Sequence, residues 1–248
     1  MTTPTPAAGG HIRGADLTGF DWTDGDLADA VFDTCVIEDA AFSNTNLNGA
    51  RFIHCRIARC RAAHADLREA VFEDCGFADA HTHAGLVVTF SELEGARFAR
   101  CDLTLSQFDR SGLHAVEMED CNLRGARFHR ADFSRSFGRN IVRTHASLRG
   151  CNLELAEMAD IRLPGCDLSR CNLREADLSG ADLEGADLRD ADLFGTLLAG
   201  AKLAGADLRG AEISGLDLLT LATRAGMKVG ADQQHRLLVA LGVDVHAS

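Results

Sequence analysis

Residues 171–195 read CNLREADLSGADLEGADLRDADLFG, which divides into five nearly identical units of five residues. Each unit has a bulky apolar residue at its centre. These centres recur every five residues in three runs, which span Ile12 to Phe77, Leu93 to Phe133 and Leu148 to Leu218. A period of five fits neither an α-helix, at about 3.6 residues per turn, nor a strand, which alternates every second residue. Each unit is therefore predicted to be a short extended side that ends in a corner.

The position two residues before each centre is nearly always small, and every cysteine of the chain lies there. They are Cys35, Cys55, Cys60, Cys75, Cys101, Cys121, Cys151, Cys166 and Cys171. A metal or redox site would not place all its thiols at one position of a repeat, whereas a tight interior accepts Ala, Ser or Cys by volume. The cysteine count is odd and no export signal is present, so we expect buried, reduced thiols.

Composition restricts the class of protein. The formal net charge is -12 at pH 7, which argues against nucleic acid as a direct ligand because a DNA-binding protein needs a basic face. No stretch reaches the roughly 18 apolar residues of a membrane span, and MTTPTPAAGG at the start does not resemble a signal peptide. The chain contains neither a phosphate-binding loop nor a nucleophile elbow. We expect a cytoplasmic protein that is not an enzyme, has no cofactor and does not contact a membrane.

The pattern A-(D/N)-(L/F)-X-X, seen in ADLSG, ADLEG, CNLRG and ARFHR, resembles that of the pentapeptide-repeat family over residues 12–218. The resemblance implies an all-β fold, a right-handed quadrilateral β-helix with four units to a coil, in which residues twenty apart stack. Phe32, Phe52 and Phe72 would then form one ladder, and Cys35, Cys55 and Cys75 another. We expect a flexible N-terminus over 1–10, a β-helix over 11–221 and a C-terminal module over 222–248.

Two segments interrupt the repeat, near 80–92 (within ADAHTHAGLVVTFSEL) and near 135–147 (within SRSFGRNIVRTHAS). Thr82, Gly138 and Arg143 stand where buried centres should be, so each segment is predicted to loop out or to distort. A β-bulge and a poorly formed coil are the alternatives. Candidate partner-binding residues are His81, Thr82, His83, Leu86, Val88, Phe90, Arg139, Asn140 and Arg143. No third metal ligand is fixed by spacing beside His81 and His83, so we predict no metal site.

Carboxylates gather in two stretches, which we interpret as acidic faces. Their residues are Asp16, Asp21, Asp24, Asp26 and Asp29, and then Asp177, Asp182, Asp187 and Asp192. Up to Leu221 the chain has 35 acidic and 22 basic residues, a net charge of -13. A rod of about 50 Å would carry about one net charge per 4 Å, whereas duplex DNA carries one per about 1.7 Å. The resemblance to the pentapeptide-repeat family implies a rod that acts as a DNA mimic, and the charge supports this only for local acidic faces. A solvated surface with no partner is the alternative.

The tail MKVGADQQHRLLVALGVDVH, residues 227–246, leaves the repeat and predicts a helix from about Asp232 to Leu241, then a short strand from Val243 to Val245. It resembles the C-terminal dimerisation module of the Qnr and MfpA branch, the quinolone-resistance proteins that bind DNA gyrase. CRAAHADLREAVF, residues 60–72, also resembles a Qnr segment. Candidate dimer residues are Met227, Val229, Leu237, Leu238, Leu241, Val243 and Val245. The alternative is a helix that only caps the open end of the solenoid.

The resemblance implies a homodimer that binds DNA gyrase or a related type II topoisomerase as an acidic DNA mimic and protects it from a drug or toxin. In the Qnr proteins two loops interrupt the coil and are needed for protection, and the two interruptions here are their natural counterparts. The alternative is a protein–protein interaction scaffold whose partner is not a topoisomerase.

Overall fold

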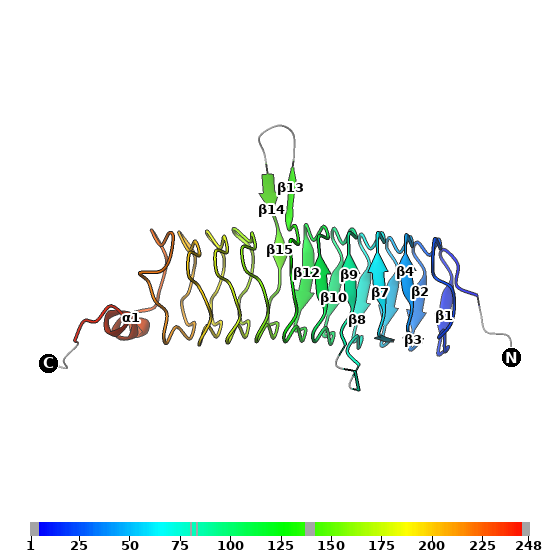
Figure 1. The fold of residues 1–248 in the computed structure, drawn as a ribbon, viewed down its shortest axis with the longest axis horizontal. Helices are drawn as coiled ribbons and strands as arrows, with labels where there is room; N and C mark the ends of the chain where they lie inside the picture. The colour runs from blue at the N-terminus through cyan, green and yellow to red at the C-terminus, as the bar shows by residue number, and fades with distance from the viewer. Residues whose placement is uncertain (1–4, 80, 83, 137–141, 245–248) are drawn as a thin grey trace.

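The computed structural model describes residues 5–79, 81–82, 84–136 and 142–244, which form one long solenoid with the N- and C-termini at opposite ends (Figure 1). The chain winds as a right-handed quadrilateral β-helix with one short C-terminal helix, which confirms the predicted fold class. We number the four sides of each coil in the order in which the chain reaches them from His11. A side runs from the residue before a centre to the corner after it.

Side 1 is a parallel sheet in which each strand pairs with the strand of the next coil. Its strands are β1 (His11–Arg13), β2 (Val31–Asp33), β5 (Arg51–Ile53), β8 (Val71–Glu73), β10 (Arg97–Ala99), β12 (Val116–Glu119) and β15 (Ala146–Ser147). Single bridges continue this ladder from Ser147 through Asp167 and Asp187 to Asp207 and Lys228. Side 1 therefore runs along almost the whole rod.

The other three sides have fewer strands. Side 2 contains β3 (Val36–Glu38) and β6 (Arg56–Ala58), and side 3 contains β4 (Ala41–Ser43), β7 (Arg61–Ala63), β9 (Val87–Thr89) and β11 (Gln107–Asp109). On side 4 the described residues pair through single bridges, such as Asp66 with Glu92. Parallel pairing on every side is the reason that residues one coil apart share a side.

The five-residue unit has the predicted geometry. Leu173 and the preceding Cys171 both point into the interior and are almost fully buried. The Leu173 N–H donates to the Asp192 carbonyl of the next coil at 2.8 Å. Corners have positive φ, as at Gly180 with φ 68°, a conformation that glycine adopts without a steric penalty. One large and one small residue per side thus fill the core.

Aromatic side chains form the expected ladder inside side 1. The rings of Phe32 and Phe52 lie 4.8 Å apart, those of Phe52 and Phe72 4.9 Å apart, and Phe98 continues the stack at 4.7 Å from Phe72. This separation is close to the spacing of hydrogen-bonded strands, about 4.8 Å. The stacking predicted for Phe32, Phe52 and Phe72 is confirmed.

The cysteines are free and buried, as predicted. Most of them form a second ladder, which contains Cys35, Cys55, Cys75, Cys101, Cys121, Cys151 and Cys171. Each of these thiols donates to the carbonyl of a centre in the preceding coil, as Cys55 does to Phe32 at 3.3 Å. Burial raises the pKa of Cys60 to about 11. The thiols therefore fill space in the interior, and those of the second ladder also satisfy backbone carbonyls.

The first interruption is an insertion of six residues. Phe52 pairs with Phe72, twenty residues later, but Phe72 pairs with Phe98, twenty-six later. The repeat resumes at Val88, which lies in β9 opposite Ala62. Leu86 and Val88 are therefore interior residues, with 5% and 0% of their surface exposed. The prediction that Leu86 and Val88 lie in a projecting loop was wrong, because the loop is shorter than the interruption predicted near residues 80–92.

The second interruption is a β-hairpin that inserts ten residues. Glu117 pairs with Ser147, thirty residues later instead of twenty. Strands β13 (Ser134–Ser136) and β14 (Val142–Thr144) pair antiparallel and project from the rod (Figure 1). Arg143 lies in β14, opposite Arg135, and its side chain is exposed rather than at the centre of a coil. The interruption is a projecting element, not a bulge.

The C-terminal module covers the end of the last coil. It contains a 3₁₀-helix, η1 (Ala231–Gln233), and the helix α1 (Gln234–Ala240), close to the predicted helix. The expected strand is not formed over its described part, Val243 and Asp244. No helix in the described part of the chain is long and apolar enough to cross a membrane.

At the N-terminal end the coil begins earlier than predicted. Gly9 donates its N–H to Ala28, and Gly10 accepts from Val31, each at 2.8 Å. Pro6 is buried. Residues 6–10 therefore contact the first coil instead of forming part of a flexible segment.

Candidate partner-binding surface

The base of the first loop is fixed by a buried carboxylate. Asp79 forms an antiparallel bridge with Ala84, so the chain leaves and re-enters the coil at adjacent points. Asp79 is only 3% exposed, and its Oδ1 accepts the N–H of His81 at 2.8 Å. A buried carboxylate needs partners of this kind, and the strongest of them is an arginine.

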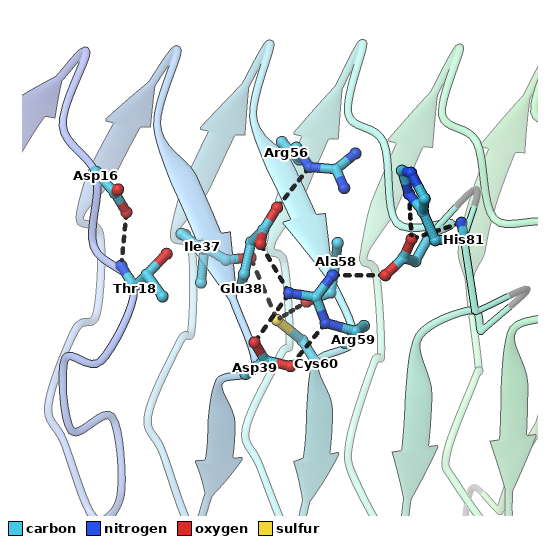
Figure 2. Close-up of polar contacts among 11 residues, drawn as sticks. Asp16, Thr18, Ile37, Glu38, Asp39, Arg56, Ala58, Arg59, Cys60 and His81 are labelled. Atoms are coloured by element: carbon cyan, nitrogen blue, oxygen red, sulfur yellow. Dashed lines mark hydrogen bonds and ion pairs between the residues drawn. The ribbon is translucent and has the colours of Figure 1, made fainter.

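Arg59 bridges three carboxylates at the corner between sides 2 and 3, as Figure 2 shows for Glu38 and Asp39. Its Nη1 lies 2.5 Å from Asp79 Oδ2, its Nη2 2.7 Å from Glu38 Oε2 and its Nε 2.7 Å from Asp39 Oδ1. The hydrogen bond from Arg59, followed by that from the His81 N–H, holds the pKa of Asp79 well below its usual value. Arg59 thereby connects the loop base to the preceding coil.

The loop candidates divide into exposed and interior residues. His81 and Thr82 are exposed, and Phe90 is 46% exposed on the corner after β9. His83 lies outside the described residues. In the part of the chain that the structure describes, no group of three His, Cys, Asp or Glu side chains could hold a metal ion.

The hairpin presents basic groups next to side 4. Arg135 in β13 forms an ion pair with Glu94, while the Arg143 side chain is exposed in β14. Arg139 and Asn140, also predicted to bind a partner, lie outside the described residues. The hairpin and the described part of the first loop leave opposite edges of the rod (Figure 1).

The aspartates of each predicted acidic face do not lie on one side of the rod. Asp177, Asp182, Asp187 and Asp192 belong to four different ladders, on sides 3, 4, 1 and 2 respectively. The N-terminal group is divided in the same way: Asp16 is on side 2, Asp21 and Asp24 are on side 3, and Asp26 and Asp29 are on side 4. Residues five apart encircle the rod, whereas residues one coil apart share a side. Consecutive aspartates in this sequence therefore form rings.

Carboxylates nevertheless gather on side 4. Among the described residues this side carries Asp26, Asp29, Asp66, Glu69, Glu92, Glu94, Asp132, Asp182 and Glu184, against Arg68, Arg135, Arg162, Lys202 and Arg224. Side 2 has a similar excess, with Asp16, Glu38, Asp39, Asp79, Asp102, Glu154, Glu175, Asp192 and Glu212 against Arg56, Arg59, Arg124 and Arg174. On both sides some carboxylates form ion pairs, such as Asp39 with Arg59 on side 2 and Asp66 with Arg68 on side 4. Sides 2 and 4 are thus both acidic surfaces, and the sequence did not reveal side 4 because the two insertions shift the twenty-residue register.

The C-terminal candidates also fall into two groups. Met227, Val229 and Leu237 pack against the core of their own chain, which fits the capping alternative. Leu241 and Val243 are 42% and 45% exposed, and Leu238 is half-buried. Val245 lies outside the described residues. Two further apolar residues, Leu219 and Val239, are exposed at this end and were not among the predicted dimer residues.

These features define the class of protein. Residues 12–49, 35–74, 113–137, 151–190 and 186–218 match the family of pentapeptide repeats. The chain belongs to the pentapeptide-repeat family.

Among solved structures, the fold is similar to that of full-length QnrB1, described as a plasmid-mediated fluoroquinolone resistance protein. The TM-score is 0.75 at 24% sequence identity, over 84% of this chain and 99% of QnrB1. Two trypsin-treated QnrB1 variants match with TM-scores of 0.72 and 0.65, at 24% and 22% identity, over 85% and 97% of this chain and all of theirs. A comparison with curated proteins gives no match. At this identity the likeness establishes the fold.

Proposed function

We propose that this protein binds a type II topoisomerase, such as DNA gyrase, as an acidic rod and protects it from a drug or toxin. The observation that carries the proposal is the acidic side 4. Its described carboxylates between Asp26 and Asp132 are not neutralised by an equal number of bases. Such a surface is complementary to the basic groove in which a topoisomerase holds DNA.

The charge density of side 4 supports the comparison with DNA. The coils from Asp26 to Asp132 are joined by five steps along the bridge ladder, which at roughly 4.8 Å each gives about 24 Å. Seven carboxylates over that length correspond to about one per 3.4 Å, close to the spacing along one strand of B-DNA. Arg68 pairs with Asp66 and Arg135 pairs with Glu94, which lowers the net density to about one charge per 5 Å. Side 4 thus resembles one strand of DNA more closely than a duplex, at a lower net charge density.

The two insertions supply contacts that a plain rod lacks. Loops on a rigid scaffold commonly carry binding residues, and here the exposed His81 and Thr82 are held at a fixed position by the Asp79–Arg59 pair. The fold-level similarity to QnrB1, a fluoroquinolone resistance protein, supports a related role for this chain.

The exposed apolar residues at the C-terminal end support a homodimer. Val239, Leu241 and Val243 lie in or just after α1, and Leu219 is 70% exposed on the last coil. A second copy that covers these residues would bury them and would place two acidic rods end to end. The module would then both cap the solenoid and join two chains.

A supercoiling assay with purified gyrase tests the proposal. The protein is expected to restore supercoiling in the presence of a quinolone or a peptide poison. Glu92→Lys on side 4 should weaken this effect by about fivefold or more. Glu119→Lys, a charge reversal at an exposed position on side 1, should change it by less than about twofold. The proposal fails if the wild-type protein neither inhibits gyrase nor relieves poisoning, and a pull-down that recovers another protein would favour the scaffold alternative.

A further inference from the structure

Side 3 carries a basic surface in the middle of this acidic rod. Its residues are Arg61, His64, Phe90, Arg110, Arg127 and Arg130, which we call the basic patch. The one carboxylate on this part of side 3 among the described residues, Asp109, is 2.7 Å from His129 Nδ1. The basic patch is therefore not neutralised by carboxylates of its own side.

Planar side chains are stacked along its edge. His64, Phe90 and Arg110 occupy the same corner in consecutive coils, each with positive φ. The rings of His64 and Phe90 lie 5.3 Å apart and within 11° of parallel, and the Arg110 guanidinium lies 5.4 Å from the Phe90 ring centre. The stack holds an exposed aromatic ring beside a cation, an arrangement that offers both apolar and charged contact.

Three arginines of the basic patch have no ion pair with a carboxylate in the described chain: Arg61, Arg110 and Arg130. The fourth, Arg127, pairs with Glu157 at 3.0 Å. Arg97 on side 1, by comparison, pairs with Glu117, whereas Arg149 and Arg170 on the same side form no ion pair with a described carboxylate. Ion pairs with described carboxylates of the rod therefore do not neutralise Arg61, Arg110 and Arg130.

The patch is short and is bounded by negative charge. Three coil steps separate Arg61 from Arg127 on the bridge ladder, which is about 14 Å. Asp24 lies beyond one end, and Glu157 and Asp160 lie at the other. A long nucleic-acid strand that ran along side 3 would meet these carboxylates, whereas about four residues of extended peptide cover the distance from Arg61 to Arg127.

We infer that the basic patch binds a short acidic segment of a partner protein, with carboxylates on Arg110 and Arg130 and an apolar side chain on Phe90. Charge-assisted hydrogen bonds from guanidinium to carboxylate supply the specificity. Arg110 and Arg130 lie at the corner between sides 3 and 4 and line one pocket with Glu92, Glu94 and Asp132, so the basic patch adjoins the acidic side 4. The inference does not rest on the topoisomerase proposal.

Fluorescence anisotropy with labelled peptides tests this inference on the full-length protein. The probe is the peptide EELEE, its neutral control is QQLQQ, and an eight-nucleotide oligothymidylate is the nucleic-acid control. We expect EELEE to bind at low salt and QQLQQ to bind at least about tenfold more weakly. R110E/R130E should weaken EELEE binding by about tenfold or more, and F90S by a few-fold.

Arg170→Glu is the matched control, because Arg170 is exposed, lies at a corner with φ 59° and has no ion pair with a described carboxylate. It should change EELEE binding by less than about twofold. Equal binding of EELEE and QQLQQ, or equal losses in R110E/R130E and Arg170→Glu, would overturn the inference. So would binding of the oligothymidylate through Arg110 and Arg130 without binding of EELEE. No topoisomerase is present, so a failure here is independent of the supercoiling result.

Discussion

Gln233 closes the open end of the solenoid with its side-chain amide. In interior coils the next coil supplies the donors, as when Ala191 O accepts the N–H of Glu212 at 2.8 Å. Ala211, one coil later, is beside the end of the rod, and its carbonyl accepts Gln233 Nε2 at 2.7 Å. The same amide donates to Leu208 at 2.8 Å. Gln233 is 2% exposed, so water cannot easily replace it.

Gln233→Ala is therefore expected to destabilise the protein measurably. The substitution removes two hydrogen bonds to carbonyls and the acceptor of the Gly230 N–H. At about 1 kcal/mol for each group left unsatisfied, and with some access of water at the rod end, the loss is about 2–3 kcal/mol. For a chain of this size that corresponds to a fall in Tm of roughly 4–12 °C.

Gln233→Glu separates hydrogen bonding from packing. The introduced carboxylate has nearly the same shape but faces the two carbonyl oxygens without a donor, so its neutral form is favoured in the folded state and its pKa is raised. The destabilisation should be largest at about pH 8 and should shrink as the pH falls through that raised pKa. Gln233→Ala, which introduces no titratable group, should show no such pH dependence relative to the wild type.

The assay is urea unfolding followed by far-UV circular dichroism, with Trp22 fluorescence as a second probe. Trp22 is buried in the first coil, at the opposite end of the rod, and coils in a solenoid couple mainly to their neighbours. The circular-dichroism midpoint should therefore fall more than the Trp22 midpoint. An unchanged midpoint in Gln233→Ala, or identical behaviour of Gln233→Glu at about pH 5 and pH 8, would refute the reasoning.

Three further predictions concern the loop, the thiols and the tail. Asp79→Ala should speed proteolysis at residues 81–84, whereas Asp16→Ala should not, and equal cleavage of both variants would count against anchoring of the loop by Asp79. Because the pKa of Asp79 is lowered, the wild-type loop should stay anchored above the ordinary aspartate pKa and lose its anchor only as the pH falls below it. The thiols should label slowly until denaturant is added, and rapid native labelling of most of them would contradict their burial. Leu241→Arg should halve the mass measured by light scattering, unlike Leu105→Arg at an exposed position on the rod; an unchanged mass would argue against the C-terminal dimer.

Much of the fold could be predicted because each five-residue unit of the sequence forms one side of a coil. A centre such as Leu173 and a small residue such as Cys171 specify one side each, and their order along the chain specifies the winding. The positions of Leu86 and Val88 could not be predicted in this way. The spacing from Phe77 to Leu93 shows that residues are inserted, but the point at which the chain re-enters the coil depends on the bridge between Asp79 and Ala84.

The candidate surface was harder to predict than the fold. Aspartates five apart, such as Asp182 and Asp187, look like one acidic stretch in sequence but lie on different sides. The acidic side 4 joins residues such as Asp66 and Glu92, which are twenty-six apart because of the first insertion. Surface charge in a solenoid therefore follows the register between coils, and that register depends on loop lengths that the repeat pattern does not contain.

The central claim, that the acidic side of the rod engages a topoisomerase, is tested most directly by supercoiling with gyrase and a poison. The account predicts that the wild-type protein restores supercoiling, that Glu92→Lys loses most of this effect, and that Glu119→Lys retains it. Absence of any effect of the wild-type protein across a wide concentration range would contradict the account, as would equal activity of Glu92→Lys and Glu119→Lys.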